Sequence, residues 1–144
     1  MKNVFAPEFD IKRFRYWTLN LHYNQSYLGR TICYLNTYKE KLSELEKEEC
    51  FELFDIIKIY QRSLTKLWKP DWWNYAQLGN ITRHLHVHFI PRYKDKRIFE
   101  GAEFIDERWG DNYAPTPKRE FNQAINEKIK VKIREAIDSL ENMA

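Results

Sequence analysis

Three of the four histidines in this 144-residue chain lie in one short segment, at two-residue spacing. His84, His86 and His88 alternate there with apolar residues. Successive side chains on a β-strand point to opposite faces, so the imidazoles would line one face at intervals of about 6–7 Å. On a helix the same spacing would scatter them around the cylinder. The pattern therefore predicts a strand with three imidazoles on one face and apolar side chains on the other.

Two chemistries suit such a set of imidazoles. Neutral imidazole is a common metal ligand, and two histidines two residues apart can supply half of a tetrahedral zinc site. The third lies too far along a straight strand to reach the same ion, so His22 or a carboxylate would have to complete the site. The other chemistry is nucleophilic catalysis, in which one imidazole attacks phosphorus and its neighbour donates a proton or hydrogen bond to the departing oxygen. Adjacent positions on one face suffice for this.

Four segments have the alternation or the β-branched and aromatic content that is typical of strands. They are residues 15–21, 31–35, 73–78 and 81–90. Gly79-Asn80 predicts a turn between the last two strands. We expect residues 1–14 to be a lead-in segment and residues 93–115 to be irregular.

Two long helices are predicted from apolar residues that recur at three- and four-residue intervals. The first covers residues 43–68, and Pro70 stops it. Its apolar stripe consists of Cys50, Leu53, Phe54, Ile57, Tyr60, Leu64, Leu67 and Trp68. The last helix is expected to begin at Thr116-Pro117, an N-cap and first-turn pair. Its stripe consists of Phe121, Ile125, Ile129, Ile133, Ile137 and Leu140. The sequence leaves open whether this helix docks on the sheet or on a second subunit.

The amino-acid composition excludes some classes of protein and favours others. A hydrophobic content of 43% and an aromatic content of 16% exclude a disordered chain. The net charge of +3 suits an anionic ligand but is too small to indicate duplex nucleic acid. Cys33 and Cys50 form neither a CxxC motif nor a disulfide framework, which predicts a reduced, cytoplasmic setting. No signal-peptide core and no membrane-length apolar run occur, so we expect no membrane partner.

The order of the predicted elements indicates the fold class. Strand, strand, helix, strand, strand, helix, with short returns between strands, predicts an antiparallel sheet with a packed helix, an α+β domain. A chain of this length is expected to form a single domain over residues 1–144.

Residues 84–90, His-Leu-His-Val-His-Phe-Ile, resemble the motif of the histidine triad (HIT) family, in which three histidines alternate with apolar residues. Pro91-Arg92 continues the motif as in many members. Residues 74–80 are similar to the family's Asn/Gln strand and the glycine turn after it. The resemblance implies the HIT-like fold, with a sheet of about five strands, a long packed helix and a C-terminal helix.

Further upstream, Leu28-Gly29-Arg30 followed by the strand at 31–35 resembles the family's Gly-His and strand, and residues 42–45 resemble the segment that leads into the long helix. The resemblance thus covers about residues 15–92. Residues 93–144 are an extension with no matching motif.

The resemblance implies nucleotide hydrolysis or nucleotidyl transfer at an α-phosphate, as in hydrolases of the diadenosine tetraphosphate kind. His86 would be the nucleophile and would form a transient nucleotidyl-histidine that water resolves. His88 would hydrogen-bond the bridging or leaving oxygen, and His84 would orient the pair. Hydrogen bonding at one ring nitrogen fixes the tautomer and leaves the other nitrogen free to attack.

The resemblance also implies nucleotide contacts at His22, Arg30, Asn74, Gly79 and Asn80. Gly79 and Asn80 would bring backbone N–H groups and an amide close to the phosphate oxygens. Asn74, allowing a one-residue slip, would be a second polar contact near the phosphate. His22 stands at the offset where relatives contact the ribose.

Two positions depart from the family pattern. Arg30 stands where relatives often carry a histidine beside the phosphates, and Tyr38 stands where another histidine often follows the strand. Arginine can hold phosphate bidentately but does not shuttle a proton near neutral pH. Trp72, Trp73 and Trp109 could stack on a base, although large aromatic side chains are more often part of a core.

The expected substrate is a nucleoside-phosphate-X compound, either a dinucleoside polyphosphate such as diadenosine tetraphosphate or an adenylated amine. No obligatory cofactor is expected, and Mg²⁺ would come complexed with a polyphosphate substrate. The family resemblance implies a homodimer. Two further interpretations stay open: a non-catalytic nucleotide-binding or signalling module, and a metal-binding protein that uses His84, His86 and His22.

Overall fold

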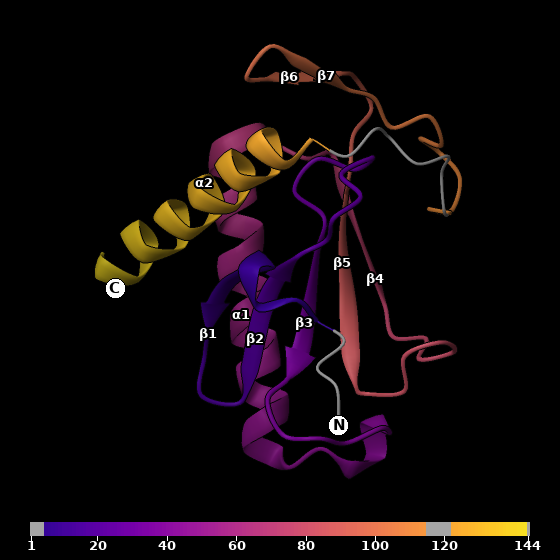
Figure 1. The fold of residues 1–144 in the computed structure, drawn as a ribbon, viewed down its shortest axis with the longest axis vertical. Helices are drawn as coiled ribbons and strands as arrows, with labels where there is room; N and C mark the ends of the chain where they lie inside the picture. Colours follow the sequence, from indigo (N-terminus) through magenta and orange to yellow (C-terminus); the bar gives the residue numbers. More distant parts are fainter. Residues whose placement is uncertain (1–4, 115–121, 144) are drawn as a thin grey trace.

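The computed structural model of the protein describes residues 5–114 and 122–143 (Figure 1). Five strands form one antiparallel sheet in the order β1-β2-β3-β5-β4. They are β1 (Asp10–Arg13), β2 (Trp17–Leu21), β3 (Thr31–Leu35), β4 (Trp72–Ala76) and β5 (His86–Arg92). The predicted α+β class and its five-stranded antiparallel sheet are confirmed.

Two helices pack with this sheet, α1 (Lys47–Trp68) and α2 (Gln123–Asn142). Short 3-10 turns cover Pro7–Phe9 and Leu42–Glu44. Within the described ranges, no helix is both long enough and apolar enough to cross a membrane.

Helix α1 covers one face of the sheet, behind the strands in Figure 1. Glu46 and Glu49 form a capping box at its start, and Lys69, in the left-handed conformation at φ 50°, ends it. Its fully buried apolar positions are Ile56, Tyr60 and Leu64. They pack in one core with side chains from the strands: Trp17, Leu19, Leu21, Cys33, Leu35, Val87 and Phe89. The predicted stripe was wrong at Phe54, which is 62% exposed because it lies on the outer side of the helix.

Helix α2 packs on α1 and on β1, which answers the question of where it docks. Ile129, Ile133 and Ile137 are fully buried there. Asn122 caps the start, accepting a hydrogen bond from the backbone N–H of Ile125. The predicted cap at Thr116-Pro117 and the stripe residue Phe121 lie outside the described residues.

Three strands form where the sequence predicted none. β1 forms in the predicted lead-in segment; Ile11 is the only buried residue of this strand, and its alternation is too short to detect. A contact with α2 stabilises this strand: the Arg134 guanidinium donates hydrogen bonds to the backbone carbonyls of Asp10 and Ile11. The other two strands, β6 (Arg97–Phe99) and β7 (Ala102–Phe104), form a hairpin in the region expected to be irregular.

The turn of that hairpin explains why it was missed. Glu100 and Gly101 both have positive φ, 51° and 75°, as a two-residue hairpin turn of this type requires. Glycine is usual in such a turn but glutamate is not, so the residue types at this turn do not clearly predict a hairpin.

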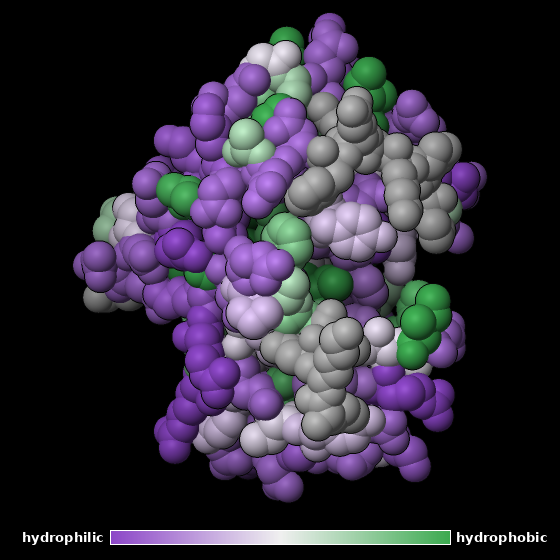
Figure 2. Space-filling model, viewed as in Figure 1, coloured by the Kyte–Doolittle hydropathy of each residue, from purple (hydrophilic) through white to green (hydrophobic). Residues whose placement is uncertain are grey.

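The strand with the histidines begins later than expected. β5 starts at His86 rather than at residue 81, and His84 lies in a bend before it. Across the sheet His88 pairs with Ile32 of β3 and with Ala76 of β4. His86 and His88 therefore share the face opposite to α1. That face is mostly hydrophilic in the space-filling view, with green and pale residues around a central hollow (Figure 2).

Candidate active site

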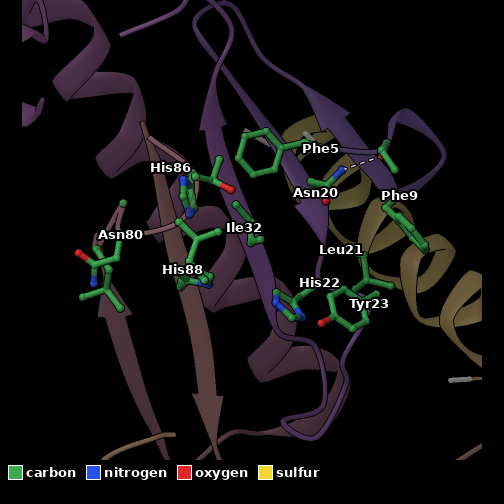
Figure 3. A pocket seen from close by; sticks show the side chains of 15 residues that line it. Phe5, Phe9, Asn20, Leu21, His22, Tyr23, Ile32, Asn80, His86 and His88 are labelled. Atoms are coloured by element: carbon green, nitrogen blue, oxygen red, sulfur yellow. Dashed lines mark hydrogen bonds between the residues drawn. The ribbon is translucent and has the colours of Figure 1, made fainter. Parts of the chain in front are cut away.

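A pocket of about 620 Å³ opens on the sheet face opposite to α1. It is built from the N-terminal segment, the ends of β2 and β3, the loop after β4, and β5 (Figure 3). Its apolar lining includes Phe5, Phe9, Leu21 and Ile32, and its polar lining includes His22, Gly79, Asn80, His86 and His88. An apolar cavity with a few convergent polar groups is the usual form of a small-molecule site.

His86 is held with one ring nitrogen free. Its Nδ1 lies 2.7 Å from the backbone carbonyl oxygen of His84. A carbonyl only accepts hydrogen bonds, so Nδ1 carries the proton and Nε2 has an unprotonated lone pair. Burial lowers the pKa of His86 below its ordinary value, which keeps the ring neutral at pH 7. His86 is therefore set up as a nucleophile.

His88 has the opposite tautomer. Its Nδ1 lies 3.4 Å from a terminal nitrogen of Arg30. Because a guanidinium only donates, Nδ1 of His88 accepts and the proton lies on Nε2. Burial, then the positive charge of Arg30, lowers the pKa of His88 to about 4. The His86 and His88 rings are 5.2 Å apart between centroids, so a lone pair and an N–H donor are neighbours in one pocket.

His84 acts from outside the pocket lining. Its Nε2 donates to the carbonyl oxygen of Leu35 at 2.6 Å, and its ring stacks on Tyr38 at a centroid distance of 5.1 Å. Its own carbonyl receives the Nδ1–H of His86. The contact that orients the His86 ring therefore comes from the backbone of His84, and the imidazole of His84 holds the bend against Leu35 and Tyr38.

His22 lies beside the triad, with its ring 6.0 Å from that of His88 between centroids. Its Nδ1 accepts the backbone N–H of Asn24 at 3.0 Å, so its proton lies on Nε2. Burial, then the charge of Arg30, lowers the pKa of His22 to about 3. His22 is thus a second neutral N–H donor, close to His88.

Gly79 and Asn80 also reach the pocket, from the loop of residues 77–85 between β4 and β5, where a tight turn was predicted. Gly79 has φ +68°, a conformation that favours glycine, and Asn80 lines the cavity next to it. Asn74 is not brought to this pocket. It accepts a hydrogen bond from Arg92 and lines a separate hollow of about 610 Å³ together with Trp72 and Trp109.

The third tryptophan, Trp73, contacts Tyr60 edge to face at 5.7 Å and packs against the core. The role of packing, rather than base stacking, therefore fits this residue best.

Sequence reasoning missed Phe5. Its ring stacks on Tyr34 at 4.6 Å and lies 5.2 Å from the ring of His86 (Figure 3). The segment is also tied to β2, since the side chain of Asn20 donates to the carbonyl of Ala6. An isolated aromatic residue 81 positions before His86 has no periodic pattern around it, and only the folded chain brings the two together.

The four histidines do not gather around one point. Among residues 5–114 and 122–143, no group of three or more His, Cys, Asp or Glu side chains is arranged to hold a metal ion. The metal interpretation required His84, His86 and His22 to converge, and His84 turns to Leu35 instead.

Acid is expected to destabilise the fold through His88. The folded-state pKa of about 4 lies below the ordinary 6.5, so the unfolded chain takes up the proton first as pH falls. The free energy of unfolding should therefore be unaffected above about pH 6.5 and drop by roughly 3 kcal/mol between about pH 6.5 and 4. His22 adds a second decrease that extends to about pH 3. Urea titrations across this range measure the slope, and His88→Asn should flatten it. An equally steep slope in the variant would contradict the assignment.

Comparison with known proteins supports the fold. No protein-family model matches the chain, and no curated protein does. Solved structures do match. A histidine triad protein from Sinorhizobium meliloti has a TM-score of 0.73 at 19% identity, covering 88% of this chain and 87% of its own. A hypothetical histidine triad nucleotide-binding protein from Sulfolobus tokodaii has a TM-score of 0.68 at 21% identity, covering 92% and 85%.

A uridylyltransferase matches as well, with a TM-score of 0.60 at 17% identity, covering 93% of this chain and 42% of its own. At these identities the similarity concerns the fold. The histidine motif, however, lies in this chain at the start of β5, an inner strand of the sheet, and its His86 and His88 line the pocket. The chain therefore has the histidine triad fold.

Proposed function

We propose that this protein is a nucleotide hydrolase or nucleotidyl transferase that attacks the α-phosphate of a nucleoside-phosphate-X substrate. The observation that carries the proposal is the pair of complementary tautomers. His86 has a free Nε2 and His88 has an Nε2–H, side by side in a pocket with apolar walls. The names of the structural neighbours, a nucleotide-binding protein and a uridylyltransferase, agree with it.

The geometry suits a two-step displacement. Nε2 of His86 bonds to phosphorus, the bond from phosphorus to X breaks, and its electron pair leaves with X. His88 donates a hydrogen bond to the departing atom. Water then bonds to phosphorus, the electron pair of the P–N bond returns to His86, and the proton from water passes to solvent.

The hydrogen bond from Nδ1 of His86 to the carbonyl of His84 makes the first step easier. Positive charge develops on the imidazole ring as the P–N bond forms, and the carbonyl dipole stabilises it. The same bond holds the ring in the direction of attack, so little reorganisation is needed.

The pocket offers matching places for the rest of a nucleotide. The apolar lining from Phe5, Phe9 and Leu21 suits a base, and Asn80 and Gly79 lie where they can meet phosphate oxygens. Mg²⁺ bound to a polyphosphate substrate is compatible with this arrangement.

A substrate panel tests the proposal. Purified protein is incubated with diadenosine tetraphosphate, adenosine phosphoramidate and a nucleotide sugar, and products are identified by chromatography. Release of a nucleoside monophosphate is expected from at least one of them. If nucleotides raise the melting temperature and no compound is consumed, the protein is a non-catalytic nucleotide-binding module, and the hydrolase proposal is wrong.

The proposal includes a homodimer formed at β4. β4 is an edge strand of the sheet, and an edge strand can pair with a second copy. Gln61 of α1 contacts Tyr75 of β4, and the neighbouring outer side of α1 exposes Phe51 and Phe54 by 60% and 62%. Light scattering of the purified protein should give the mass of two chains, and a single-chain mass at all concentrations would contradict the dimer.

A further inference from the structure

Arg30 is a buried cation that lacks an anion. Its relative exposure is 8%, and none of the ion pairs formed by residues 5–114 and 122–143 includes it. Its Nε has no hydrogen-bond partner among these residues. The guanidinium meets the Nδ1 of His88 at 3.4 Å and the ring of Tyr113 at 5.7 Å. A buried charge without a counter-ion is costly, and proteins keep one mainly where a ligand supplies the opposite charge.

Arg92 provides the contrast within the same fold. It is also buried, but its guanidinium forms a bidentate ion pair with Asp106 and three more hydrogen bonds to protein oxygens. Arg92 is fully satisfied by the protein itself. The missing anion at Arg30 is therefore a property of that position and not of buried arginines in this chain.

The position of Arg30 relative to His86 and His88 indicates where the missing anion would bind. Ile32 of β3 lies opposite His88, so Arg30, two residues before Ile32 on the same face, lies beyond His88 on the side away from His86. The order along the sheet is nucleophile, N–H donor, cation. In an in-line displacement the leaving group lies on the far side of phosphorus from the nucleophile. With phosphorus at His86 and the bridging oxygen at His88, the leaving group extends along the sheet toward Arg30, which contacts the pocket-lining His88 and is not itself among the described residues that line the pocket.

We infer that Arg30 supplies the counter-charge for a phosphate in the leaving group, so that the substrate is a phosphoanhydride and not a phosphoramidate. The inference rests on the proposed function and decides between its two substrate classes. Among residues 5–114 and 122–143, no Asp or Glu lines the pocket, so a leaving phosphate meets no carboxylate from this part of the chain.

The two leaving groups differ in whether they must take up a proton to depart. When a P–O–P bond breaks, the electron pair stays on the bridging oxygen and the product leaves as a phosphate anion, which a guanidinium stabilises without proton transfer. When a P–N bond breaks, the amine must take up a proton. Arg30 does not give one up near neutral pH. His88 is neutral there, so it offers a hydrogen bond but no excess proton.

The experiment compares two substrates of the same nucleoside in the full-length protein. Diadenosine tetraphosphate has an anhydride-linked leaving group, and adenosine phosphoramidate has an amine one. Wild-type protein should have the higher kcat/KM on the anhydride. Arg30→Gln should lower kcat/KM on the anhydride by about 100-fold and on the phosphoramidate by less than about threefold. Arg30→Lys should lower kcat/KM on the anhydride by less than Arg30→Gln does, because lysine keeps the positive charge but lacks the planar guanidinium with its paired N–H donors.

Arg83→Gln is the matched control. It removes the same charge one residue before the triad, from a side chain that is 72% exposed and 3.9 Å from Glu40. It should change either kcat/KM by less than about twofold, because solvent screens it. Equal losses on both substrates in Arg30→Gln, or faster wild-type turnover of the phosphoramidate, would overturn the inference and leave the proposed function standing. Consumption of neither compound, nor of any other in the panel, by the wild type would instead contradict the proposed function.

A stability measurement separates this role from a structural one. Because the guanidinium is unpaired, Arg30→Gln without ligand should melt at or above the wild-type temperature. A lower melting temperature with equal losses on both substrates would make Arg30 a structural residue. If the variant does not fold, the wild type still provides a test: ADP should bind at least about tenfold more tightly than AMP. Equal affinities would overturn the inference.

Discussion

His86→Ala is expected to reduce kcat by about 10⁴-fold or more while leaving the fold intact, because it removes the atom that bonds to phosphorus. The variant loses one hydrogen bond, from Nδ1 to the carbonyl of His84, so the free energy of unfolding should change by about 1 kcal/mol. Steady-state kinetics on whichever substrate the panel identifies, together with urea unfolding, measures both quantities. Full activity in His86→Ala would end the nucleophile assignment.

His88→Ala is the matched comparison, since it removes the neighbouring imidazole from the same pocket. A group that only hydrogen-bonds the leaving oxygen should cost about 10²–10³-fold in kcat, less than the nucleophile. Rapid quenching of wild-type protein under alkaline conditions, followed by peptide mass spectrometry, should find a nucleotide on His86. A nucleotide found on His88 instead would exchange the two roles.

Arg92→Ala is expected to lower the free energy of unfolding by about 3–5 kcal/mol. The guanidinium is 3% exposed and donates to both carboxylate oxygens of Asp106, at 2.7 and 3.0 Å. It also donates to the carbonyls of Arg108 and Asp111, so it ties the segment after β7 to β5. Removing it leaves the Asp106 carboxylate buried without a counter-charge, which is where most of the cost arises. Chemical denaturation of both proteins measures the difference.

A double variant separates the ion pair from the packing. Arg92→Met with Asp106→Leu removes both charges, so it should regain much of the stability that Arg92→Ala loses. Lys96→Met is the surface control, because Lys96 and Glu103 are 55% and 54% exposed and their ion pair should contribute less than about 1 kcal/mol. A double variant no more stable than Arg92→Ala would show that the loss came from packing.

Long periodic segments of this chain were predicted well. The strand at residues 31–35 was found at the same bounds, and the helix predicted for residues 43–68 is α1, preceded by a 3-10 turn. The residue types alone indicate both: β-branched and aromatic residues in the strand, and apolar residues at three- and four-residue intervals in the helix. The short strand β1 and the hairpin β6-β7 have no such pattern, because contacts with α2 and a positive-φ turn stabilise them.

The candidate site was predicted in part. The two-residue spacing placed His86 and His88 on one face, and the structure puts both in one pocket with Gly79, Asn80 and His22. It placed His84 on the same strand, whereas His84 lies in the bend before it. Asn74 has the residue type of a phosphate contact, yet Arg92 holds it in a different hollow.

By itself, the sequence determined which side chains could do chemistry and which class of fold would hold them, since both depend on residue type and short-range spacing. The fit of Nδ1 of His86 to the carbonyl of His84 is also local, two residues apart. The tertiary structure alone decided the partners of the other rings. Arg30 reaches His88 across 58 residues of sequence and Leu35 reaches His84 across 49. A tautomer depends on whether the partner donates or accepts, and only folding brings these partners together.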